Sequence, residues 1–175
     1  IYGAGGKGGH GGKGLAARAQ DGYPGMSALG IEHAATINNS GLIRCGYAGG
    51  GGGSGAGNDP SDKTYTDFGR SGAGGGGGAG LPAGSGGGGI AQSRGGATGG
   101  NGGRGGDFVD PASNGVEGDR RDDRAYTNTP GTPGNAGVDG KAIYYRSTAI
   151  RNASTVTGNS VGGRNGGEAV SIDIR

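Results

Sequence analysis

The residues of this chain that could carry out chemistry are few and widely spaced. It contains two histidines, His10 and His33, and a single cysteine, Cys45. Catalysis or metal binding needs a nucleophile with its base, or several ligands, held together by the fold. One cysteine makes no intrachain disulfide and no cysteine-rich zinc site, and the two histidines are read more simply as solvated residues of an edge and a turn. We therefore expect no catalytic residue, no metal and no cofactor, and predict that the protein is not an enzyme.

Nucleotide-binding motifs are also absent. Residues 3–8, GAGGKG, match the spacing GxGxxG, but no strand precedes them and no helix-forming sequence follows, as a dinucleotide site requires. The aspartates of residues 107–123 lack the spacing of a calcium loop. The net charge of +2 gives no case for nucleic acid. No run of 18 apolar residues exists, so membrane insertion is not expected.

A more promising set of residues is aromatic and lies in polar stretches. Residues 58–70 and 107–129 are rich in turn-forming and charged residues and carry both phenylalanines of the chain. Aromatic side chains beside polar groups are typical anchors of binding surfaces. The candidate binding residues are Tyr65, Asp67, Phe68, Phe108, Asp110 and Tyr126. For Phe68 and Phe108 the alternative is structural, namely that they shield the end of the scaffold.

The number and spacing of the glycines predict the scaffold that must position these residues. Glycine makes up 52 of 175 residues, whereas Ile, Leu, Val and Phe total only 21, too few for an ordinary hydrophobic core. From Ala4 onward the side chains of Ala4, Lys7, His10 and Lys13 fall on every third residue, with glycine between them. Three residues per turn is the period of polyproline II, a helix without internal hydrogen bonds. A flexible linker would not keep this phase.

We therefore predict a fold that is neither α nor β. It is a single domain over residues 1–175, a bundle or sandwich of about six or seven antiparallel polyglycine II helices joined by loops. All-glycine runs belong at its centre and runs with one glycine in three at its edge. A short strand is expected within residues 170–174, which alternate apolar and polar residues. The expected runs are residues 3–14, 22–32, 45–57, 71–90, 95–106 and 130–142, followed by a less regular segment, 143–175.

Antiparallel runs place alternate connections at the same end of the bundle. The connections 15–21, 58–70 and 107–129 should then share one end. Recognition residues tend to lie on loops held by a rigid scaffold, so this end is the predicted binding surface.

The order of these features resembles a known family. The chain opens with IYGAGGKGGHGG and continues through INNSGLIRCGYAGGGGGSGAG and GAGGGGGAG to TPGTPGNAGVDGKAI. This succession is similar to the tip adhesins and distal tail-fibre domains of tailed bacteriophages, above all the adhesin on the long tail fibres of T-even-type phages. The resemblance covers residues 1–143 and implies a polyglycine II bundle whose loops at one end contact a host outer-membrane protein or surface polysaccharide. It also implies an extracellular location at the distal end of the tail fibre of the virion, with the remainder of the fibre as a second partner.

The sequence departs from that family in lacking the amino-terminal attachment part, which implies the terminal domain of a larger fibre. Two other functions remain open. One is a structural glycine-rich fibre domain. The other is an antifreeze protein of the springtail type, also a polyglycine II bundle, although the 30 charged residues fit poorly with the flat uncharged face that ice binding needs.

Overall fold

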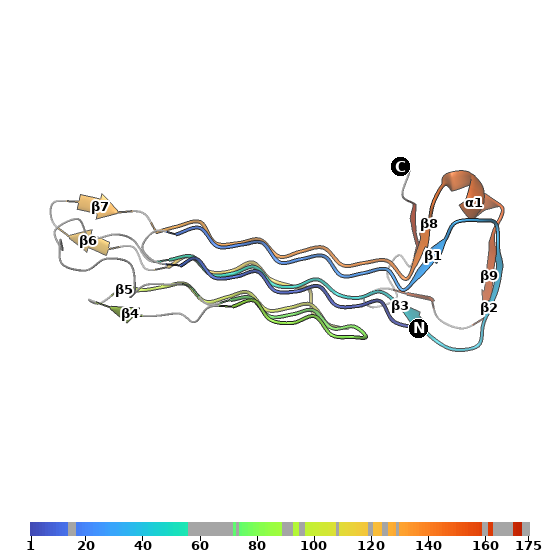
Figure 1. Ribbon diagram of the computed structural model, residues 1–175, viewed down its shortest axis with the longest axis horizontal. Helices are drawn as coiled ribbons and strands as arrows, with labels where there is room; N and C mark the ends of the chain where they lie inside the picture. The colour runs from blue at the N-terminus through green and yellow to red at the C-terminus, as the bar shows by residue number, and fades with distance from the viewer. Residues whose placement is uncertain are drawn as a thin grey trace.

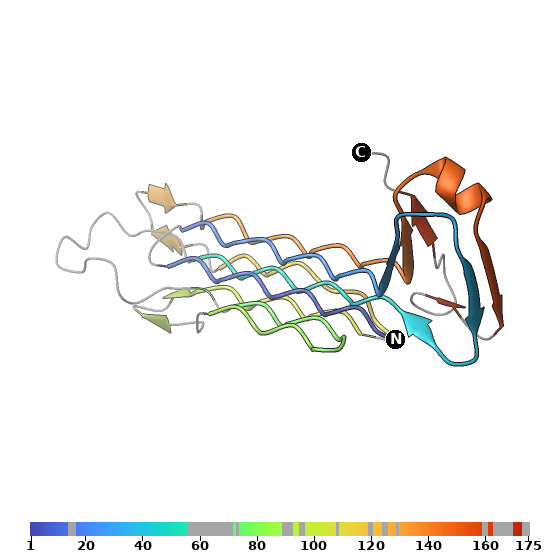
Figure 2. The same ribbon diagram turned by 45° about the vertical axis from the view of Figure 1, so that its right-hand side comes forward.

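The computed structural model shows an elongated bundle with a small cap at one end (Figures 1 and 2). It describes residues 1–13, 17–55, 72, 74–88, 93–94, 97–107, 109–118, 121–123, 126–128, 130–158, 161–162 and 170–172. As expected, the fold is neither α nor β, with 4% helix and 15% strand. Within the described residues the bundle has eight extended glycine-rich segments, here g1 (3–13), g2 (17–28), g3 (45–55), g4 (72–79), g5 (83–88), g6 (99–106), g7 (112–118) and g8 (130–141).

Backbone hydrogen bonds join the segments at every third residue. The N–H groups of Gly3, Gly6, Gly9 and Gly12 donate to the carbonyls of Arg44, Tyr47, Gly50 and Gly53 at 2.8–3.0 Å. The residues between them bond to other segments, so that Gly5, Gly8 and Gly11 donate along g5. A segment with no internal bonds thus satisfies its backbone through its neighbours. Segments that follow one another in the chain are antiparallel, as predicted, but g1 and g3 run parallel.

Segment g3 is the centre of the bundle. Its residues are all buried, and its backbone is hydrogen-bonded to g1, g2, g4, g6, g7 and g8. These six also bond to one another around it, through Gln20 N–His10 O, Gly22 N–Asn135 O, Gly115 N–Gly134 O, Ser113 N–Arg104 O, Gly76 N–Gly103 O and Gly75 N–Gly9 O. Segment g5 lies outside this ring against g1 and g4. The predicted central place of the run 45–57 is confirmed for its described residues 45–55, whereas the run 71–90, also expected at the centre because of its all-glycine part, lies around g3 and outside it.

Close approach of the backbones explains why glycine is required. A Cβ on Gly49 would lie within 3.0 Å of the carbonyl group of Lys7 and of the Gly8 nitrogen. The same holds for most glycines that face a neighbouring segment, so any side chain there would force two segments apart. Most charged side chains of the bundle lie on its outer edges, where Lys7, Lys13 and Arg104 are exposed as expected, while Tyr47 and Ser54 are buried within g3.

The cap is a small β structure in which every pair of strands is parallel. A three-stranded sheet has the order β1–β8–β11, where β1 is Leu29–Ile31, β8 is Ile143–Tyr145 and β11 is Val170–Ile172. Two further pairs join β2 (Thr36–Asn39) to β9 (Thr155–Gly158) and β3 (Ile43–Arg44) to β10 (Val161–Gly162). Helix α1, Thr148–Asn152, follows β8 and begins at Ser147, whose hydroxyl accepts from the N–H of Ile150 at 3.3 Å.

The cap holds the apolar core that the bundle lacks. Its buried members are Ile31, Ile43, Ala142, Ile143 and Tyr145. Segments g2 and g8 run side by side in parallel and continue directly into β1 and β8, where Leu29 pairs with Ile143. The cap therefore extends the bundle's hydrogen bonding while its side chains bury one another. The strand expected near the C-terminus is confirmed as β11, whereas the cap core and α1 were not predicted.

Two expected elements were wrong because the edge of the bundle tolerates more side chains than its centre. The run 71–90 is two segments, and the chain reverses at Gly80, Leu81 and Pro82. Glycine falls on every third position from 72 to 87 except at 81, and Leu81 is 72% exposed at the turn. Segment g2 likewise begins at Ala17 and not at residue 22, since an edge segment needs few glycines.

The connection 107–129 was also misread as one loop. Residues 107 and 109–111 belong to a turn, and 112–118 form g7, which needs glycine where it meets g3, at Gly115. The bundle therefore has eight described segments where six or seven were expected. Two hairpins were not predicted. One pairs β4 (Ser93–Arg94) with β5 (Ala97–Thr98), so that the start of the expected run 95–106 is a strand, and the other pairs β6 (Arg121–Asp123) with β7 (Tyr126–Asn128) within the connection 107–129.

Candidate functional site: the loop end of the bundle

The end of the bundle opposite the cap, here called the loop end, is where four connections meet. Its described residues are close neighbours. Gly72 N donates to Gly12 O at 2.9 Å, Gly55 N to Ala17 O at 2.9 Å, and Gly131 N to Gly55 O at 3.1 Å. These bonds gather the residues that flank the stretches 14–16, 56–71 and 119–129. The fourth connection contains β4 and β5, which lie at the same end (Figure 1).

A buried hydroxyl holds g7 to the central segment at this end. Ser54 is fully buried, and its Oγ accepts from the N–H of Gly118 at 2.9 Å. Gly118 is the last described residue before the connection that carries β6 and β7. The bond therefore fixes the point from which that connection leaves the scaffold.

Two of the four connections are polar and aromatic in sequence. The stretch 56–71 reads AGNDPSDKTYTDFGRS and the stretch 119–129 reads DRRDDRAYTNT. Tyr126 belongs to β7, at the loop end, as predicted for a binding residue. Tyr65, Asp67 and Phe68 lie outside the described residues, in the stretch that starts after Gly55 and returns at Gly72.

Asp110 does not belong to this surface, and the expectation that it does was wrong. It lies in the turn 107–111, which is at the cap end because Gly106 N bonds to Ala48 O and Ala79 N to Gly106 O. Its carboxylate Oδ2 accepts from Nη1 of Arg104 at 2.7 Å, and its own N–H donates to Oδ1 of Asp107. Phe108 lies outside the described residues, but its neighbours Asp107 and Val109 belong to the same turn. The physical reason is that g7 carries the chain back to the loop end after this turn.

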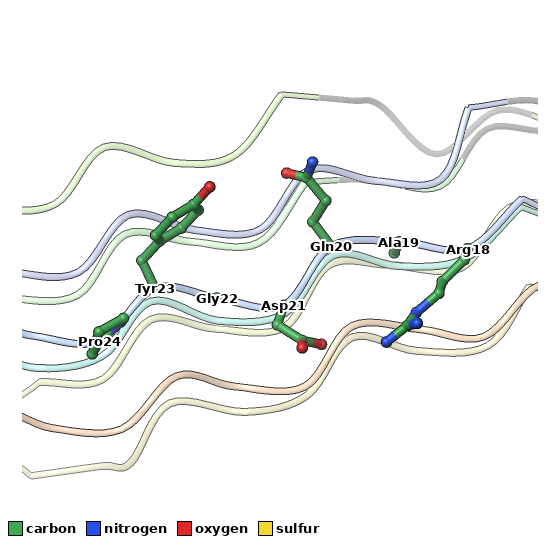
Figure 3. Close-up of a pocket in the computed structure, with 7 residues that line it drawn as sticks. All are labelled: Arg18, Ala19, Gln20, Asp21, Gly22, Tyr23 and Pro24. Atoms are coloured by element: carbon green, nitrogen blue, oxygen red, sulfur yellow. The ribbon is translucent and has the colours of Figure 1, made fainter.

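A shallow open groove of about 520 Å³, which the sequence analysis did not predict, runs along the outer side of g2. Figure 3 shows Gln20 and Tyr23 on one side of the g2 backbone and Arg18 and Asp21 on the other. Tyr23 is 51% exposed, whereas Asp21 is engaged, since its Oδ1 accepts from the N–H of Asn135 at 2.7 Å. The signal for such a groove is the triplet phase itself, which places residues three apart on the same side.

The described part of the chain contains no cluster of three His, Cys, Asp or Glu side chains that could hold a metal ion. His10 is engaged in the scaffold, where its Nδ1 accepts from the N–H of Gly88 at 2.8 Å. Among the described residues, no helix has the length and apolar character needed to cross a membrane. The loop end is therefore described by its connections and by the hydrogen-bonded segments that hold them.

Comparison with known proteins gives no relative for this chain: no family model, no curated protein and no solved structure matches it.

Proposed function

We propose that the eight segments are polyglycine II helices. Three features support this assignment: the hydrogen bonds recur every third residue, none of them lies within a segment, and glycine Cβ positions are filled by neighbouring carbonyls. Such a bundle gains roughly 0.5–1.5 kcal/mol net per hydrogen bond against the entropy that glycine loses on ordering. It is therefore a stiff support that depends little on an apolar core.

On this support the loop end serves as a receptor-binding tip. We infer a non-enzymatic attachment protein of a tailed-phage fibre that recognises a host outer-membrane protein or surface polysaccharide. The observation that carries the proposal is that the described residues which flank the long polar and aromatic stretches, Gly55, Gly72, Gly118 and Gly131, are gathered at one end, away from the cap. The bundle fixes their bases, so their sequence can change without disturbing the scaffold.

Substitution of the aromatic residues tests this proposal. Tyr65, Phe68 and Tyr126 should be changed to Ala together, and binding of the labelled protein to whole Gram-negative cells and outer-membrane extracts measured. Aromatic anchors typically contribute 2 kcal/mol or more each, so binding should fall by about a hundredfold or more. The matched controls are Phe108→Ala, whose sequence neighbours Asp107 and Val109 lie in the turn at the cap end, and Tyr23→Ala, on the side of the bundle.

Equal loss from the triple variant and from Phe108→Ala would contradict the proposal, because the described residues that flank these substitutions lie at opposite ends of the bundle. Circular dichroism and thermal unfolding of each variant separate loss of binding from loss of the fold. Unchanged binding by a correctly folded triple variant would assign recognition elsewhere on the molecule.

One observation favours a second function, ice binding. The exposed residues of g5 are all small, namely Ala83, Ser85, Gly86 and Gly88. Charged side chains such as Lys7 and Arg104 stand on neighbouring edges and argue against it. Thermal hysteresis in a dilute solution of the protein would support this function in place of attachment.

A further inference from the structure

The cap contains a cavity of about 770 Å³ that is separate from the loop end. It is lined by Glu32, His33, Tyr144, Arg146, Ser147 and Ile150. Glu32 and His33 directly follow β1, and Arg146 and Ser147 directly follow β8. Since β1 and β8 are neighbouring parallel strands, their carboxyl ends meet at one edge of the sheet. In sheets built from parallel strands this edge is the usual place for a ligand.

The charged groups of this cavity are not used by the fold. Glu32, His33 and Arg146 are exposed, and within the described residues their side chains make no hydrogen bond or ion pair. Glu32 and Arg146 carry opposite charges and line the same cavity, yet they do not pair with each other. Both remain available to a molecule that occupies the space between them.

Stability of the cap does not explain these residues either. Its buried side chains are Ile31, Ile43, Ile143 and Tyr145, none of which lines the cavity. The backbone at this edge is already tied, because Arg146 N donates to Ile31 O at 3.0 Å. Ser147 of the lining caps α1 and Ile150 packs against the core, so only the charged side chains of Glu32, His33 and Arg146 are an addition to the cap.

The chemistry of the lining defines a ligand class. Arg146 supplies N–H donors, Glu32 supplies acceptors, the Ser147 hydroxyl can donate its proton, and Tyr144 and Ile150 offer apolar surface. The formal charges of Glu32 and Arg146 cancel, which disfavours a phosphate or a divalent cation. A ligand with many hydroxyl groups and apolar C–H faces can bond to the Arg146 donors and the Glu32 acceptors and also pack against the Tyr144 ring. The volume lies within the range of about 300–1,000 Å³ that is typical of small-molecule sites.

We propose that the cap cavity is a binding site for a neutral saccharide of one or two rings. Its hydroxyl groups bridge the Glu32 carboxylate and the Arg146 guanidinium, and one face lies against Tyr144. The site is independent of the proposed receptor-binding tip, since it rests on the cap alone.

Ligand-observed NMR with the full chain tests this site. Methyl glycosides of glucose, galactose and mannose, together with lactose and maltose, serve as probes. At least one probe should show saturation transfer. Glu32→Gln and Arg146→Met should each weaken its binding by about tenfold to a hundredfold, because each removes hydrogen bonds to a charged group.

Two controls match these charge changes outside the cavity, Glu117→Gln on g7 and Arg151→Met at the end of α1, and both should bind as the parent does. Absence of transfer from every probe at high concentration would overturn the proposal, as would equal weakening by the controls. Competition by inorganic phosphate would also overturn it, because the site would then be an anion site of Arg146. Retention of saccharide binding by the triple variant of the loop end would support the separation of the two sites.

Discussion

Replacing Gly50 by alanine tests the idea that bare backbones in contact hold this protein together. Gly50 lies in the middle of g3, and a Cβ there would lie within 3.0 Å of the carbonyl group of Gly103 and of the Arg104 oxygen. Gly86 is the matched control, because it is exposed and a Cβ there would meet only the Gly75 oxygen, at 3.5 Å. The two changes are chemically identical and differ only in what surrounds the added methyl group.

The structure gives the expected magnitude. To accept the methyl group of Gly50→Ala, g6 must move away from g3, which strains the bonds Gly103 N–Gly51 O at 2.7 Å and Gly76 N–Gly103 O at 2.9 Å. Each such bond contributes roughly 0.5–1.5 kcal/mol, and overpacking adds about 1–3 kcal/mol. Alanine restricts the unfolded chain and offsets about 0.4–1 kcal/mol of this. The net loss is roughly 1–5 kcal/mol. Gly86→Ala keeps only the favourable effect of about 0.4–1 kcal/mol.

Thermal unfolding followed by circular dichroism measures the difference. For a chain of this length about 2–4 °C corresponds to 1 kcal/mol. Gly50→Ala should therefore lower Tm by roughly 2–20 °C. Gly86→Ala should leave Tm unchanged or raise it by about 1–4 °C. If the two variants unfold at the same temperature, close backbone packing around g3 is not what requires glycine, and the reasoning fails.

Two further substitutions test single contacts of the scaffold. Ser54→Ala leaves the buried N–H of Gly118 without its acceptor and should lower the free energy of unfolding by about 1–3 kcal/mol in chemical denaturation. Ser113→Ala, which removes an acceptor of the exposed Arg104 N–H, should cost less because water replaces it, and an equal loss from both would contradict this account. Asp110→Asn breaks an ion pair whose side chains are 55% and 48% exposed. It should change the free energy of unfolding by less than about 1 kcal/mol, with the effect shrinking at high salt; a larger, salt-independent loss would show that the pair stabilises the turn.

The sequence alone located the glycine-dense parts of g1, g3 and g6, where glycine occupies two or three positions of each triplet. Residues 45–55 could be placed at the centre because a segment surrounded on all sides has almost no room for side chains. Lys7, Lys13 and Arg104 could be placed at the outer edge for the same reason. This rule depends on local sequence, because the number of glycines in each triplet indicates how many sides of the segment contact a neighbouring backbone.

Edge segments could not be read in this way. Residues 17–21 and 112–118 have neighbours on only some sides, so few of their residues must be glycine, and their sequence looks like that of a loop. Position 81 was the one visible sign of the turn between g4 and g5. Missing g7 placed Asp110 at the loop end, although the turn that holds it lies at the cap end.

The tertiary structure alone decided how the distant parts meet. That g2 and g8 are parallel neighbours follows from the packing of six segments around g3, and this in turn aligns β1 with β8 and creates the cap cavity between Glu32 and Arg146. Contacts between residues more than a hundred positions apart leave no periodic signal in the chain. Glycine spacing therefore determined which backbones can touch, while the order in which they pack around one another determined where the binding surfaces lie.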